Sequence, residues 1–318
     1  MSHSAPLAVD RPAIEAAAIR IAPYLRHTPI LRPGRLPGLP DDLVLKLELL
    51  QASGSFKPRG AFNRMLSALS AQVPQAGVIA ASGGNHGAAV AFAARALGAQ
   101  AEIFVPEPTP ATKLDRIAGY GARVVRGGAS YAEAAAACAA RQQETGALNV
   151  HAYDDAAVLA GQGTVGMEFA AQAPELTHVL VAVGGGGLIG GVAAWYAGAA
   201  RVIAVEPENC PGLTRALAAG KPVEAPVSGL AADSLGARQV GALMFPVAAA
   251  HVAQSVLVPD AAIADAQRLL WDACRLIAEP GGATALAALL CGAFVPPPGA
   301  RVGVVVCGAN TDPGKIAS

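Results

Sequence analysis

The sequence predicts an α/β protein made of two open, twisted and mostly parallel sheets. Short apolar runs alternate with segments of helical periodicity through residues 78–151 and again beyond residue 165, which is the order that parallel sheets require. Loops rich in glycine and small polar residues follow several of these runs, at the strand ends where open α/β sheets bind ligands. The 318 residues are enough for two closely packed domains.

The first clear elements surround Lys57. A strand is expected at Leu43–Leu49, where apolar and mixed positions alternate. Pro58 suits the first turn of the helix that follows, because no N–H is needed there. The same proline disfavours helical geometry at Lys57, so we expect Lys57 to lie just before the helix, near the positive end of its dipole.

Residues 77–152 are expected to form a small inserted α/β domain, and residues 1–76 and 153–318 a larger one. In the small domain we expect strands at Val78–Ala81, Ala101–Val105, Arg123–Val125 and Leu148–His151, with helices at Ala88–Leu97, Ala111–Tyr120 and Tyr131–Glu144. The larger domain should continue with helices at Val165–Ala171, Ala261–Ile277 and Thr284–Leu290, and with strands at Val179–Val183, Val202–Val205 and Val302–Val306.

Composition excludes several classes of protein. Hydrophobic residues make up 53% of the chain, charged residues 14%, and the formal net charge is zero, so nucleic acid and membrane are not expected as partners. The five cysteines form no CxxC pair, which argues against a disulfide framework or zinc site and favours a reducing cytoplasm. The N-terminus lacks the apolar core of a signal peptide. Residues 179–200 are uncharged, but four glycines within them indicate a strand, a turn and a buried helix.

Those four glycines predict a phosphate site. Gly184, Gly185, Gly186 and Gly187, followed by Leu188, come after an apolar strand and open an apolar helix. Backbone N–H groups in such a loop can converge on an anion. The run lacks the lysine of a P-loop and fits the dinucleotide fingerprint only when forced. Tight packing of helix against strand is the alternative interpretation.

A second loop, Ser82-Gly83-Gly84-Asn85-His86-Gly87, also lies between a strand and a helix. Its N–H groups, hydroxyl and amide could hold a carboxylate. Alternatively, Ser82 or Asn85 simply caps the following helix. Alone, His86 is better explained as a loop histidine than as a base. A lysine forms Schiff bases with aldehydes when its pKa is lowered, so Lys57 together with a phosphate loop points to pyridoxal 5′-phosphate.

Several motifs in order carry a family resemblance. The segments are LKLELLQASGSFKPRGA, ASGGNHG, AYDDAAVLAGQGTVGMEF, VAVGGGGLIGG, VIAVEPE, AEPGGATALAAL and VVVCGAN. Together they resemble the fold-type II pyridoxal-phosphate enzymes, specifically the threonine/serine dehydratase and serine racemase family. The resemblance extends from about residue 27 to residue 310. It implies an α/β fold of two open sheet domains with the cofactor between them, and a homodimer.

The resemblance also implies a role for individual residues. Lys57 would hold the cofactor as a Schiff base and act as the catalytic base. The cofactor would be bound by Phe56, Lys57, Asn85, Gly184, Gly185, Gly186, Gly187, Leu188, Glu279 and Cys307. The substrate would be bound by Ser82, Gly83, Asn85 and His86. The implied activity is that of an ammonia-lyase, which dehydrates and deaminates L-threonine or L-serine to a 2-keto acid and ammonia.

The sequence departs from the family at several positions. Racemases carry a serine where Gly83 stands, so racemisation is not expected. In the family's cation site Glu206 and Cys210 match, but Gly212 replaces the second acid, and no metal is predicted. Ser234 stands where many members have glycine. The chain ends soon after Asn310, so no C-terminal regulatory domain is expected.

Other functions stay open from the sequence. Racemases and β-replacement synthases share the fold. A dinucleotide-dependent oxidoreductase could use the glycine run, with Glu206 on the ribose, but it gives Lys57 and Asn85 no role. A catalytically silent phosphate-binding module is the third class.

Overall fold

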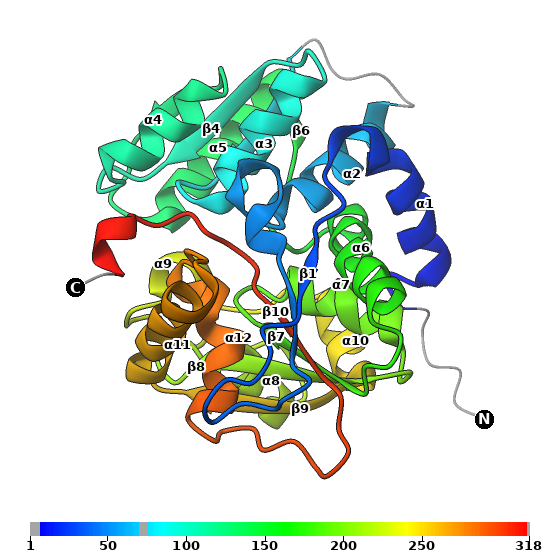
Figure 1. Cartoon of the computed structure of the whole chain (residues 1–318). Helices are drawn as coiled ribbons and strands as arrows, with labels where there is room; N and C mark the ends of the chain where they lie inside the picture. The colour runs from blue at the N-terminus through cyan, green and yellow to red at the C-terminus, as the bar shows by residue number, and fades with distance from the viewer. Residues whose placement is uncertain (1–6, 70–75, 317–318) are drawn as a thin grey trace.

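The structure is a computed structural model that describes residues 7–69 and 76–316. Two sheets organise these residues (Figure 1). The larger has the strand order β1-β2-β10-β7-β8-β9, and the smaller has the order β5-β4-β3-β6. Neighbouring strands pair in parallel, except for the antiparallel pair of β1 with β2. The predicted fold class of two mostly parallel sheets is confirmed.

The larger sheet lies in the lower half of Figure 1. Its strands are β1 (Ile30–Leu31), β2 (Val44–Lys46), β7 (His178–Ala182), β8 (Arg201–Pro207), β9 (Val252–Val258) and β10 (Val302–Val305). Its accompanying helices are α1 (Arg11–Ile21), α2 (Lys57–Leu69), α6 (Ala156–Gln172), α7 (Gly187–Tyr196), α8 (Gly212–Ala219), α9 (Ala232–Leu235), α10 (Met244–His251), α11 (Asp260–Cys274) and α12 (Pro280–Leu290). Among the described residues, no helix has both the length and the apolar character needed to cross a bilayer.

The smaller sheet is built from residues between 78 and 149, and the part of the chain around it is called the small domain below. Its strands are β3 (Val78–Ala81), β4 (Ala101–Val105), β5 (Arg123–Arg126) and β6 (Leu148–Asn149), and its helices are α3 (Asn85–Ala96), α4 (Ala111–Gly119) and α5 (Tyr131–Thr145). The domain boundaries at residues 77 and 152 stay predictions.

Aromatic rings fasten the small domain to α2. Phe62 of α2 stacks on Tyr24 with ring centroids 5.0 Å apart and meets Phe92 of α3 edge-on at 5.8 Å. Phe92 in turn meets Tyr120, at the end of α4, at 5.5 Å. Offset and edge-on pairs are the arrangements that aromatic quadrupoles favour. Since α2 begins at Lys57, this ladder connects the helix of the candidate catalytic lysine to the small domain.

Most predicted elements are present, and the differences have physical causes. Lys57 is the first residue of α2, not the residue before it, so the prediction that Pro58 keeps it outside the helix was wrong. Helix α6 starts at Ala156, nine residues before the predicted start, because the Asp155 side chain accepts hydrogen bonds from Ala157 N and Val158 N. The predicted helix at 261–277 ends at Cys274, since Arg275 adopts a left-handed conformation with φ +56°.

Candidate active site

Three adjacent strands of the larger sheet bring distant segments together. Strand β10 lies between β2 and β7 and runs parallel to both. Their carboxyl ends therefore lie at one edge of the sheet, where the 51–56 loop, Cys307 and Gly184–Gly187 follow. The N–H of Phe56 donates to the Cys307 carbonyl at 3.2 Å, which ties two of these segments directly. The topology thus places Lys57, Cys307 and the glycine run close together.

The amine of Lys57 lies in enclosed surroundings at the start of α2. Its Nζ donates a hydrogen bond to the Ala152 carbonyl at 2.8 Å and lies 5.2 Å from the centroid of the Phe56 ring. Burial lowers the pKa of Lys57 to about 8, although the charges of Cys307 and Glu279 act in the opposite direction. A lower pKa leaves more of the amine neutral near pH 7, and the neutral amine is the form that attacks an aldehyde.

The glycine run opens α7 with a backbone that side chains disfavour. Gly186 is the N-cap residue with φ +90°, and no side chain caps the helix. The ring of Tyr153 packs beneath the run: a methyl group at 185 would overlap that ring, and one at 187 would lie 3.0 Å from the Tyr153 Cβ. The tight packing is therefore present, and it occurs together with N–H groups that no side chain caps, while the phosphate site stays a prediction.

Asn85 joins the small domain to the larger one. Its Nδ2 donates to Glu279 Oε1 at 2.6 Å, and its Oδ1 accepts from Asn310 Nδ2 at 2.7 Å. Asn310 Nδ2 also donates to the Ser53 carbonyl at 2.8 Å. Burial raises the pKa of Glu279 to about 7, although the bond from Asn85 lowers it. Ser82 Oγ accepts from the N–H of Gly84 at 3.2 Å.

Two histidines lie near Lys57, and both are favoured in the neutral form. His86 is buried and its Nε2 lies 2.7 Å from the Val150 carbonyl, so this nitrogen carries the proton and donates. Burial, followed by the charge of Lys57, lowers the pKa of His86 to about 3. His151 Nδ1 accepts from the N–H groups of Tyr153 and Asp154 at 3.3 and 2.8 Å. Burial lowers the pKa of His151 as well.

The Cys307 thiol is buried and neutral. Its Sγ donates to the Gly281 carbonyl at 3.4 Å. Burial, and then the charge of Glu279, raises the pKa of the Cys307 thiol above its usual value. A neutral thiol beside a bound ring is a weak donor, so it would withdraw little charge from that ring.

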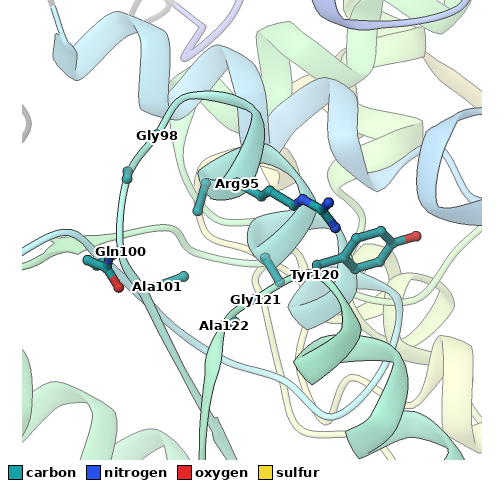
Figure 2. A pocket seen from close by; sticks show the side chains of 10 residues that line it. Arg95, Gly98, Gln100, Ala101, Tyr120, Gly121 and Ala122 are labelled. Atoms are coloured by element: carbon teal, nitrogen blue, oxygen red, sulfur yellow. The ribbon is translucent and has the colours of Figure 1, made fainter.

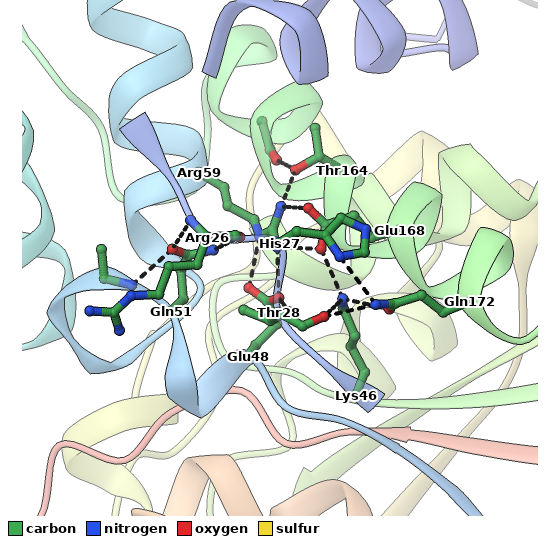
Figure 3. Close-up of polar contacts among 12 residues, drawn as sticks. Arg26, His27, Thr28, Lys46, Glu48, Gln51, Arg59, Thr164, Glu168 and Gln172 are labelled. Carbon is green, nitrogen blue, oxygen red and sulfur yellow. Dashed lines mark hydrogen bonds and ion pairs between the residues drawn. The ribbon is translucent and has the colours of Figure 1, made fainter. Parts of the chain in front are cut away.

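A group of four charges, three of them buried and one half-buried, supports the start of α2 and is called the ion cluster below (Figure 3). It consists of Lys46, Glu48, Arg59 and Glu168. Arg59 donates twice to Glu48 and twice to Glu168 at 2.8–2.9 Å, and its fifth N–H donates to Thr164 at 3.0 Å. Two positive and two negative groups balance, and every donor of Arg59 has an acceptor.

Glu206 does not form part of this site. It is buried within β8, and its carboxylate accepts from the N–H groups of Leu213 and Thr214 at 2.6 and 2.8 Å and from Thr214 Oγ1 at 2.7 Å. The Cys210 carbonyl accepts from Gly212 N at 3.0 Å. In the described part of the chain, no group of three metal-ligating side chains occurs. Glu206 caps α8 through its bonds to Leu213 and Thr214, and the expected absence of a metal stays a prediction.

Comparison with known proteins places this arrangement in a family. The sequence profile described as "Pyridoxal-phosphate dependent enzyme" matches residues 21–308. The chain belongs to this family of pyridoxal-phosphate dependent enzymes. It is 35% identical to serine racemase from Arabidopsis thaliana, over 97% of this chain and 95% of the relative. It is 37% identical to phenylserine dehydratase from Ralstonia pickettii, over 97% of this chain and 95% of the relative. A solved threonine deaminase, from the organism abbreviated T.th., superimposes with a TM-score of 0.88 at 38% identity, over 95% of this chain and 99% of that one.

Pyridoxal 5′-phosphate is the cofactor of this family member, and the residues present fit it. Lys57 supplies an enclosed amine of lowered pKa. The start of α7 supplies N–H groups without a side-chain cap, suited to a phosphate. The buried Cys307 thiol, whose pKa is raised above its usual value, adds no charge beside the ring. The predicted family and cofactor are confirmed.

Five contributors to the site were not predicted from the sequence. Three of them stand in motifs quoted above and two do not, but none of the five could be assigned a role from the sequence because each acts through its position in space. They are His151, the carbonyl of Ala152, Tyr153, Asn310 and Thr109, whose side chain packs over Gly83.

A cavity of about 270 Å³ lies elsewhere, on the small domain (Figure 2). Arg95 and Tyr120 are its large lining side chains, and the rest of the lining is glycine, alanine and Gln100. None of the predicted site residues lines it, so we assign it no part in the site.

We predict that Gly185→Ala destabilises the protein by about 1–3 kcal/mol, because its methyl group would overlap the Tyr153 ring. The shift should also displace the glycine run and weaken cofactor retention during dialysis. Gly119→Ala is the control, since nothing lies within 4 Å of the position where its Cβ would be. Equal stability of the two variants in urea unfolding would contradict the packing described here.

From the raised pKa of Glu279 we predict that the stability of the protein without cofactor depends on pH. Its pKa is raised to about 7 in the folded state, from 4.5. Between these values the folded protein holds a proton that the unfolded chain releases, so stability should fall as pH rises from 4.5 to 7, by about 3 kcal/mol in all. Urea unfolding at several pH values should show this slope, a flatter one for Glu279→Gln, and the wild-type slope for exposed Glu144→Gln.

Proposed function

We propose that this protein catalyses β-elimination from a hydroxy amino acid such as L-threonine or L-serine, releasing a 2-keto acid and ammonia. It would then be an ammonia-lyase of the threonine/serine dehydratase type. The observation that carries the proposal is that Lys57 offers a base while position 83, a glycine, offers no side-chain acid. Lys57 offers an amine of lowered pKa that can remove the α-proton. Gly83 offers no side-chain acid, and Thr109 fills the space above it: a Cβ at 83 would lie 2.8 Å from the Thr109 methyl group.

The cofactor, when bound to Lys57, supplies an electron sink that stabilises charge at the substrate α-carbon. Phe56 would then lie against its ring, and Asn85 would bond its phenolic oxygen. The backbone N–H groups of Gly184, Gly185, Gly186, Gly187 and Leu188 would hold its phosphate. Cys307 would face the ring nitrogen and keep the sink moderate, which favours prompt loss of the β-hydroxyl over a long-lived carbanion.

The loop of Ser82, Gly83, Asn85 and His86 would bind the substrate carboxylate. The first N–H groups of α3 support this role, because Gly84 is the N-cap residue and no side chain caps the helix. The His86 ring is committed to the Val150 carbonyl, so we propose that His86 contributes its backbone N–H. Thr109 packs over Gly83 and would limit the room beside the carboxylate.

Racemisation is the second candidate, because serine racemase of Arabidopsis thaliana is similar over nearly its whole length. Gly83 and Thr109 argue against it, since no proton donor stands at position 83. A β-replacement synthase of the same fold stays a further alternative. The dinucleotide-dependent oxidoreductase gains no support, because Glu206 caps α8 and is not available to a ribose.

The test is a substrate panel with purified protein. The preparation should show the visible band of lysine-bound pyridoxal phosphate, and borohydride should abolish it. L-Threonine, L-serine and L-phenylserine should be assayed for keto acid, and L-serine also for D-serine. Keto acid from at least one substrate without D-serine supports the proposal. Rapid D-serine formation without keto acid would replace it with the racemase.

We also propose a homodimer in the cytoplasm. The dimer rests on likeness to the family, and the compartment on the five unpaired cysteines. Light scattering coupled to gel filtration measures the mass directly, and a monomer at micromolar concentration would contradict the first part.

A further inference from the structure

One ion pair joins the two domains beside the site. Lys113 of α4, in the small domain, pairs with Asp233 of α9, in the larger domain. In Figure 1, α4 lies above and α9 below the red C-terminal segment on the left of the view. Every other ion pair among residues 7–69 and 76–316 lies within one domain. This pair is therefore the single charge bridge between the two halves of the described protein.

Asp233 begins a run of three residues that contact three separate parts of the site. Asp233 pairs with α4 through Lys113. Ser234 Oγ accepts from the N–H of Gly281, in the first turn of α12, at 3.1 Å. The Leu235 backbone packs on Gly184, where an added Cβ would lie 3.0 Å from the Leu235 Cα. A movement of α9 would therefore change the contacts that it makes with the start of α12 and with the glycine run.

The ion pair is also suited to forming and breaking. The Asp233 side chain is 73% exposed and that of Lys113 is 22% exposed, so separating them returns both charges to water at small cost. The ion cluster differs, because three of its four charges are buried and cannot part without a large penalty. Both Lys113 and Asp233 act on the buried carboxyl of Glu279, with opposite signs, which places the pair within electrostatic range of the site.

We propose that Lys113 and Asp233 are positioning residues that hold the small domain closed over the larger one when substrate is bound. The proposal rests on the function proposed above. In the closed state, the Ser82–His86 loop lies over the cofactor and binds the substrate carboxylate. Breaking the pair removes no side chain that would contact the cofactor or the substrate, but it makes closure less favourable. The deficit therefore appears in substrate capture, with the chemistry at saturation largely preserved.

The test compares single charge changes with an exchange of the two charges in the holoenzyme. Lys113→Met and Asp233→Asn should each raise KM about three-fold, and Asp233→Lys about ten-fold, with kcat within about two-fold of the wild type. Lys113→Arg should preserve KM, and the exchange Lys113→Asp with Asp233→Lys should recover most of the loss. Added KCl should raise the wild-type KM and leave that of Lys113→Met unchanged. Arg126→Met removes an ion pair internal to the small domain and is the matched control.

A second measurement separates this inference from the proposed activity. Hydrogen exchange of residues 82–96 and 111–119, with and without amino acid, reports closure whatever reaction follows. Substrate should slow exchange there in the wild type and in the charge-exchanged variant, but less in Lys113→Met. If KM and exchange are the same in Lys113→Met as in the wild type, the inference fails. Absence of keto acid from a wild type whose exchange still responds to amino acid would overturn only the proposed activity.

Discussion

Lys57→Ala is expected to abolish keto-acid formation, with a loss of at least about 10³-fold, because one side chain has two duties. In the proposed function it anchors pyridoxal phosphate and supplies the base that takes the α-proton. The enclosed amine and its pKa of about 8 suit both duties. The measurement is the rate of keto-acid formation per mole of protein. The absorption spectrum should also lose the band of lysine-bound cofactor.

Two controls make this result specific. Lys221→Ala removes an exposed lysine and should retain wild-type turnover. Lys57→Arg keeps a positive charge at the site but provides no amine for a Schiff base, so it should be as inactive as Lys57→Ala. Circular dichroism checks that each variant is folded. Normal keto-acid production by folded Lys57→Ala would end the proposed function.

Arg59→Met is expected to cost about 3–5 kcal/mol of unfolding free energy, because it leaves the buried Glu48 and the half-buried Glu168 without the charge that balances them. Burial acts to raise the pKa of Glu168, but its bonds to Arg59 and Lys46 hold that pKa below its usual value. Arg59 is the third residue of the helix that Lys57 begins. Cofactor retention should therefore fall together with stability.

The matched control for this variant is Arg123→Met. Arg123 also pairs with a glutamate, Glu102, but its side chain is 69% exposed, so the expected loss is at most about 1 kcal/mol. Adding Glu168→Gln to Arg59→Met should recover part of the stability, since one uncompensated carboxylate is then removed. Equal losses for Arg59→Met and Arg123→Met in urea unfolding would contradict the role given to the ion cluster.

The fold was predictable where the periodicity of apolar residues agrees with the positions of the glycine and proline residues that end an element. Strands β3 and β4 have the predicted bounds, because each is a short apolar run between glycine or proline residues. Strand β9 was missed, since it lies at the sheet edge with only two of its seven residues buried, and its sequence has no clear apolar pattern. The start of α6 was missed because the helix is apolar or small on nearly every face and gives no amphipathic signal.

The site was predictable to the extent that its residues stand in motifs. Lys57, Asn85 and the glycine run were found in this way. Tyr153 was not, because its importance comes from contact with a loop more than thirty positions away in the chain. Asn310 was quoted as part of a motif, but its bond to Asn85 depends on how the two domains meet. Sequence patterns do not encode such distances.

The ring of Tyr153 beneath Gly185 has a consequence for engineering. A larger residue at 185, or more space around the glycine run, requires a smaller side chain at 153. The reason is that a side chain at 185 would overlap the Tyr153 ring. A library of single substitutions would recover neither the change at 153 nor the change at 185, because each is unfavourable without the other. Paired libraries at 153 and 185 should recover folded variants that neither position yields alone.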